Sequence, residues 1–229
     1  MISRRAAIAF ALVALITVNL AMIFIAVAQY RALFTQPGAR IAVLGPVTVL
    51  VVYAVVIVWI GRARGAHWEM IVRSATFYGL LGGALDVLNI GIENGIPIAL
   101  HGTVLTIGLM LTLFASWAVA GFRMARNLGS IWAGVFAAII SAGICMLIAV
   151  AGGFTTQFFI LRPDPAYIST WAEFKRSGWT DARAFGLANT LDSALTHLII
   201  APIVALIFGG CASLLAQLRF GRLPSTPSV

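Results

Sequence analysis

Charged residues are scarce in this sequence. Of its 229 residues, 15 are Lys or Arg and only 7 are Asp or Glu, so that 10% of the chain is charged, whereas a soluble domain carries about 25%. Hydrophobic residues make up 61%, and apolar runs of about 20 residues, the length that crosses a bilayer, recur through the chain. This composition excludes a soluble protein and predicts an all-α polytopic membrane helix bundle, with 1–229 as a single membrane domain.

The sequence also lacks the short motifs of several enzyme classes. It has no G-x-S-x-G elbow, no phosphate-binding lysine loop, no dinucleotide fingerprint and no H-E-x-x-H. Its two cysteines, Cys145 and Cys211, lie inside apolar runs, where we expect inert packing thiols rather than a disulfide framework. These absences favour a protein that is not an enzyme, without deciding the question.

The net charge of +8 does not indicate a nucleic-acid partner. The basic residues occur singly or in pairs between apolar runs, with no basic face. Membrane orientation explains them better, because inner segments are enriched in Lys and Arg and long outer loops count less. With six spans and an inner N-terminus, the inner side holds Arg4, Arg5, Arg62, Arg64, Arg73, Arg123, Arg126, Arg219 and Arg222. The outer side then holds Arg31, Arg40, Arg162, Lys175, Arg176 and Arg183. The bias predicts that both termini lie inside.

The apolar runs predict six membrane-spanning helices, over 6–28, 41–60, 75–92, 103–122, 131–152 and 184–218. The first run follows two arginines and ends in an A-x-A sequence, as a secretory signal does, but it is too long for one, and we expect a retained helix. The last run is too long for one simple crossing. We therefore predict a break near Pro202, either as a bend in a tilted helix or as an interfacial helix that leads into a shorter span.

Glycines cluster in the third run. Gly79, Gly82 and Gly83 share one region of the predicted helix. Small residues let helix backbones approach closely in membranes. The cluster therefore predicts a packing surface for a neighbouring helix.

The polar stretch 155–183, between spans five and six, forms the predicted long outer loop. Asp164-Pro165 is typical of a helix start, and Gly178 of a helix stop. Between them, one helical face would carry Tyr167, Ile168, Trp171 and Phe174. The pattern predicts an amphipathic helix, which either lies on the outer leaflet or packs across the bundle as a cap.

Two acidic residues inside apolar runs, Asp86 and Asp192, are the strongest functional signal. A carboxylate at membrane depth costs several kcal/mol unless it is paired, hydrated or protonated. Asp86 shares a helical face with polar side chains three and seven residues later, and Asp192 lies in an amphipathic segment. The predicted intramembrane polar site comprises Asp86, Asn89, Glu93, Asn189, Asp192, Ser193 and His197.

Three interpretations of these acids remain open. Each acid is hydrogen-bonded within the bundle as a structural group, or it takes part in the passage of a proton, ion or solute, or it is catalytic. A metal or haem site near the outer leaflet is a weaker hypothesis, because no metal-ligand spacing is present. Its candidate ligands are His101, His197, Asp192 and Glu93.

The leading functional hypothesis is a small transporter-like or permease-like protein of a bacterial inner membrane, whose carboxylates couple ion, proton or small-solute passage. The first alternative is a non-catalytic subunit or assembly factor of a larger membrane complex, as a homo-oligomer or with other proteins. The second alternative is an outer-leaflet metal- or haem-binding protein. Lipid is the expected environment, and no cofactor is predicted.

Overall fold

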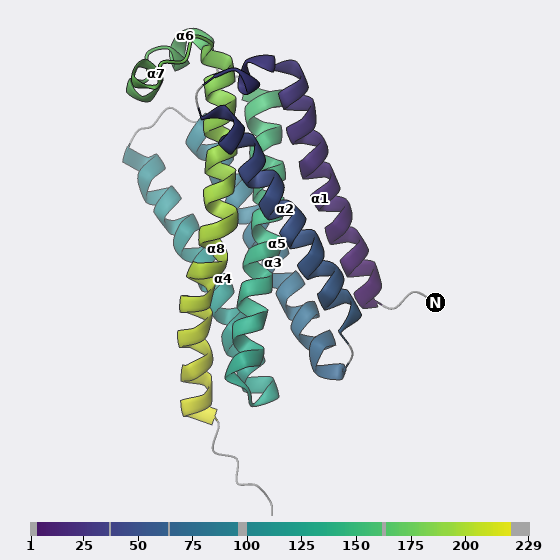
Figure 1. Ribbon diagram of the computed structural model, residues 1–229. Helices are drawn as coiled ribbons and strands as arrows, with labels where there is room; N and C mark the ends of the chain where they lie inside the picture. Colours follow the sequence, from purple (N-terminus) through teal and green to yellow (C-terminus); the bar gives the residue numbers. More distant parts are fainter. Residues whose placement is uncertain (1–3, 37, 64, 96–99, 162–163, 221–229) are drawn as a thin grey trace, which may run out of the picture.

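A computed structural model describes residues 4–36, 38–63, 65–95, 100–161 and 164–220, and this part of the chain is helical, with no strands (Figure 1). Its elements are α1 (Arg4–Gln29), η1 (Arg31–Phe34, a 3₁₀ turn), α2 (Ala39–Arg62), α3 (Ala66–Gly95), α4 (Leu100–Leu128), α5 (Ile131–Phe154), η2 (Thr155–Leu161, a π-helix), α6 (Pro165–Ile168), α7 (Ala172–Ser177) and α8 (Ala182–Phe220).

Within the described ranges, six of these helices, namely α1 to α5 and α8, are long and apolar enough to cross a membrane, which confirms the predicted helical membrane bundle. Several extend beyond the predicted runs; α3, for example, begins at Ala66 rather than at residue 75. Hydropathy marks only the apolar part of a helix, whereas the backbone hydrogen bonds continue into its polar flanks. In Figure 1, α6 and α7 lie at one end of the bundle, hereafter the cap end, and the start of α1 and the end of α8 lie away from it.

Helix α5 occupies the centre of the bundle and packs against α1, α3, α4 and α8 (Figure 1). It is the most buried of the six: 78% of its most apolar stretch is buried, against 17% for α1. A helix that is apolar all round belongs inside a bundle. Its start is fixed by Ser130, whose hydroxyl accepts a hydrogen bond from the Ala133 N–H.

The glycine cluster of α3 forms the packing surface that the sequence predicts. A Cβ added to Gly79 would lie 2.7 Å from Ile144 Cβ, and one added to Gly83 would lie 2.8 Å from Ile148 Cβ, both on α5. These positions have room for glycine alone. The close approach of α3 and α5 therefore depends on them.

Helix α8 is assigned as one helix from Ala182 to Phe220 with Pro202 inside it, and a bend at this proline stays a prediction. Proline has no N–H, so Pro202 leaves the carbonyl of Leu198, four residues earlier, without its helical donor. The hydroxyl of Tyr53 on α2 donates a hydrogen bond to this carbonyl at 2.8 Å. A neighbouring helix thus satisfies the group that the proline leaves unpaired, which a sequence reading of α8 alone does not reveal.

The segment predicted as one amphipathic helix consists of two short helices, α6 and α7. The hydroxyls of Ser169 and Thr170 donate to the carbonyls of Ala166 and Tyr167, at 2.6 and 2.7 Å, and so compete with continuation of the helix. The start and the stop lie where the sequence indicates. Asp164 accepts a hydrogen bond from the Ala166 N–H, and Gly178 follows α7 in the left-handed conformation, at φ 73°.

These two helices cover part of the bundle end. Ile168 is buried and lies so close to Gly186 of α8 that a Cβ there would be 2.8 Å from Ile168 Cδ1. The beginning of the predicted loop is also helical, because η2 continues directly from α5. We refer to residues 164–181 as the cap.

Candidate functional site

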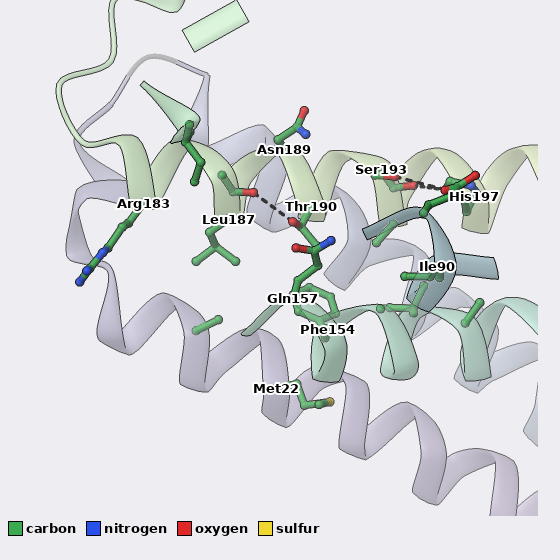
Figure 2. A pocket seen from close by; sticks show the side chains of 18 of the residues that line it. Met22, Ile90, Phe154, Gln157, Arg183, Leu187, Asn189, Thr190, Ser193 and His197 are labelled. Atoms are coloured by element: carbon green, nitrogen blue, oxygen red, sulfur yellow. Dashed lines mark hydrogen bonds between the residues drawn. The ribbon is translucent and has the colours of Figure 1, made fainter. Parts of the chain in front are cut away.

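A cavity of about 950 Å³ opens between α1, α3, α5 and α8 beneath the cap. Its lower walls are apolar, with Met22 on α1, Phe154 at the end of α5 and Leu187 on α8. Its polar side chains come chiefly from α3 and α8. Figure 2 shows the cavity with α8 along one side and α1 along the other.

The α3 wall carries the three polar residues that share a face in the sequence. Asp86 is 4% exposed and Asn89 is 1% exposed, whereas Glu93 is exposed, and all three line the cavity. The Asn89 amide nitrogen donates to Glu93 Oε1 at 3.3 Å. Because a carboxylate only accepts, this contact fixes the orientation of the amide. Asn89 Oδ1 is left buried without a hydrogen bond in the described part of the chain.

The carboxyl of Asp86 is the deepest acidic group of the cavity. Within the described ranges, the hydrogen bonds and the salt bridge do not involve it. Glu93 and His197 are titratable side chains near enough to act on it. A buried carboxyl with no fixed partner is costly, and this cost makes Asp86 a candidate binding group.

The α8 wall includes three of the four predicted residues. Asn189, Ser193 and His197 line the cavity, whereas Asp192 is exposed and is not part of its lining. The row that faces the cavity comprises Gly186, Thr190, Ser193 and His197. These positions follow helical spacings of four, three and four, and Asp192 lies outside that row. The structure therefore does not bring the two aspartates together.

His197 presents a hydrogen-bond acceptor. Its Nδ1 lies 2.7 Å from the carbonyl oxygen of Ser193. A carbonyl oxygen only accepts, so Nδ1 carries the proton in this contact. In the neutral ring, Nε2 is then left with its lone pair free to accept.

Several lining residues are not part of the sequence prediction. Gln157 comes from η2, and Figure 2 shows it pointing toward Thr190 of α8. Its position depends on a π-helix in a segment that the sequence indicates as loop. Tyr30, Tyr167 and Trp171 also line the cavity. Tyr167 and Trp171 belong to the face that the sequence marks as amphipathic, which is the one signal that points to them.

Of the candidate metal ligands, the side chains of Glu93, Asp192 and His197 are described. Glu93 and His197 line the cavity, and Asp192 does not. The side chain of His101, in the first turn of α4, lies outside the described residues. Among the described residues, no group of three His, Cys, Asp or Glu side chains is arranged to hold a metal ion.

The fold and the cavity define a helical, multi-pass membrane protein with a polar cavity near one end of its bundle. Comparisons with known protein families, with curated proteins and with solved structures found no match. The geometry of this cavity is therefore the basis for a functional proposal.

The cavity wall is expected to be accessible to water. In a bilayer, we expect a cysteine at position 193 (Ser193→Cys) to react with a water-soluble maleimide at least about tenfold faster than one at position 203 (Ile203→Cys), because thiols react as thiolates, which hydrocarbon disfavours. Both sites are exposed on α8, but only Ser193 lines the cavity. Cys211→Ser removes the exposed native thiol, and Cys145 is buried. Equal rates would contradict a water-filled cavity.

Proposed function

We propose that this protein is a small permease-like membrane protein, and that its cavity admits a small polar solute or an ion to Asp86. The observation that carries the proposal is a carboxyl that is 4% exposed, belongs to a membrane-spanning helix and lines a cavity beneath the cap. Ionisable residues within membrane helices are costly, and they mark substrate, ion or proton pathways.

The packing below Asp86 supports a closed path on the far side of the cavity. One turn toward the opposite end, Gly82 lies against Leu113, Ser116 and Cys145 of the neighbouring helices, and all three side chains are buried. Gly83 is equally close to α5. A solute that reaches Asp86 from the cap would meet this close helix contact. Passage would require α3 to move relative to α4 and α5, as alternating access requires.

The distribution of basic residues favours one orientation of the bundle in the membrane. Arg62, Arg73, Arg126 and Arg219 lie in the parts of α2, α3, α4 and α8 that are remote from the cap, where the only described acidic side chain is Glu69. Such a bias favours the cytoplasmic side of an inner membrane. In this orientation the cap and the cavity face outward, and both termini lie inside.

A non-catalytic subunit of a larger membrane complex is the second candidate, and Asp192 favours it. This acid is exposed on the outer surface of α8 rather than buried in the bundle. An acid on that surface is less costly when a partner helix or polar headgroups meet it. Native mass spectrometry after gentle detergent extraction tests this reading, because a stable heteromeric partner would support it and a lone monomer would weaken it.

Flux through proteoliposomes tests the permease proposal. Purified protein would be assayed for proton flux with an internal pH-sensitive dye under an imposed potential, and for uptake of labelled small solutes. We expect Asp86→Asn to reduce the flux at least about tenfold, which corresponds to about 1.4 kcal/mol. The amide has nearly the same shape but no charge and no proton to exchange.

Asp192→Asn is the matched control, since it makes the same chemical change on a residue that does not line the cavity. Its flux should stay within about twofold of the unaltered protein, because surface substitutions away from a site change energies by about 0.5 kcal/mol or less. If Asp86→Asn transports as well as Asp192→Asn does, the proposal fails.

A further inference from the structure

Two buried hydrogen-bond acceptors lie three residues apart on the α3 wall of the cavity. Asn89 Oδ1 is buried without a partner in the described part of the chain, and the carboxyl of Asp86 has no donor there. On the α8 wall, His197 Nδ1 contacts the Ser193 carbonyl, so in the neutral ring Nε2 is a further acceptor. An acceptor-lined site selects a ligand that donates.

We propose that the cavity binds a primary ammonium ion with an apolar body, with Asp86 and Asn89 as the groups that hold the ammonium. The inference rests on the proposed function, because it assigns a substrate class to the same cavity. An ammonium supplies three N–H donors and a positive charge, which matches two buried acceptors of which one is a carboxylate. A neutral hydroxyl would supply one donor and no charge.

The size and ligand set of the cavity favour an organic cation over a bare metal ion. Its volume of about 950 Å³ lies in the range of small-molecule sites. A divalent metal would need several oxygen or nitrogen ligands around one point. Among the described side chains, no cluster of three suitable residues exists.

Apolar side chains line the cavity around the acceptors. Met22, Ile90, Phe154 and Leu187 come from α1, α3, α5 and α8 and would contact the body of such a ligand. Toward the cap, Trp171 lies edge-on to a second lining ring, that of Tyr167, at 5.9 Å between centroids. Aromatic rings contact both apolar groups and cations favourably.

The lining also contains a basic residue, Arg183. Arg183 is exposed and belongs to the first turn of α8. It precedes His197 by 14 residues, which is about 21 Å along a helix. His197 is the α8 residue near enough to act on Asp86, so Arg183 lies several helical turns nearer the cap than the proposed ammonium site.

The binding test uses the purified full-length protein and three ligands of similar shape, measured by isothermal titration calorimetry. Phenethylammonium has the charge and the donors, its N,N,N-trimethyl analogue keeps the charge without N–H donors, and 2-phenylethanol has neither charge nor ammonium. We expect phenethylammonium to bind at least about tenfold tighter than the trimethyl analogue, because two hydrogen bonds to buried acceptors are lost. The alcohol should bind more weakly still.

Two single-residue variants test whether Asp86 holds the ammonium. Asp86→Asn should weaken phenethylammonium binding about 30-fold or more, as expected when one partner of a buried charged pair is lost. Asp192→Asn should leave it unchanged. Equal binding of the ammonium and its trimethyl analogue, no loss in Asp86→Asn, or no binding of phenethylammonium at millimolar concentration would each overturn the inference.

The ligand series on the unaltered protein does not depend on whether a variant folds. It also separates this inference from the proposed function. Phenethylammonium binding without any flux would leave the binding site standing and remove the permease proposal. Flux of another solute that requires Asp86, without ammonium binding, would support the permease proposal and remove the ammonium site.

Discussion

Replacing Gly134 with leucine is expected to disrupt the packing of α4, α5 and α8 against one another. A Cβ at this position would collide with Ser213 Oγ on α8 and with the carbonyl oxygen of Gly121 on α4. Ser213 is fully buried, and its hydroxyl donates to the Gly209 carbonyl at 2.6 Å. A backbone carbonyl cannot rotate aside as a flexible side chain can. We therefore expect a loss of about 3 kcal/mol or more, the upper range for overpacking.

The measurement is the midpoint of unfolding of purified protein in detergent, together with the fraction that elutes as a single species. Gly108→Leu is the matched control, because Gly108 also lies in a membrane-spanning helix but has no atom within 4 Å of an added Cβ. That variant should be as stable as the unaltered protein or slightly more so, since glycine is a poor helix former. If the two variants have the same midpoint of unfolding, α4, α5 and α8 do not pack closely at Gly134.

Composition and apolar run length predict the six long helices because both depend on local sequence alone. The same reasoning locates the glycine surface of α3 but does not identify the helix that contacts it. Gly134 shows the limit: nothing in its flanking sequence distinguishes it from Gly108, and only the assembled bundle makes one crowded and the other open. Tertiary contacts are not encoded in the helical period.

In the candidate site, too, local sequence predicts some features and only the assembled bundle reveals others. The spacing of Asp86, Asn89 and Glu93 places them on one helical face, and all three line the cavity. Asp192 has an equally polar neighbourhood in the sequence but does not line the cavity, because the inward row of α8 passes through Ser193 and His197 instead. An amphipathic stripe spans a wide arc, and rotation of the helix against its neighbours decides which edge of it faces inward.

Removing the Tyr53 hydroxyl, by Tyr53→Phe, is expected to destabilise the bundle by about 1–3 kcal/mol, the cost of leaving a buried carbonyl unsatisfied. The hydroxyl donates to the Leu198 carbonyl, and Leu198 is 1% exposed. The ring itself is positioned by Gly143 of α5, where an added Cβ would lie 3.2 Å from Tyr53 Cε1. Tyr167→Phe, at an exposed ring of the cap, should leave the unfolding midpoint unchanged.

The role assigned to Tyr53 is tested most sharply by its dependence on Pro202. Pro202→Ala restores the backbone N–H that donates to the Leu198 carbonyl, so the hydroxyl is then no longer the only donor. In that background, Tyr53→Phe should cost at least about 1 kcal/mol less than in the unaltered protein, within the range of coupling between groups in contact. The four proteins of this double-mutant cycle would be compared by reversible unfolding in mixed micelles. If Tyr53→Phe costs the same with and without the proline, the hydroxyl stabilises the bundle by other contacts, and the continuity of α8 through Pro202 has a different cause.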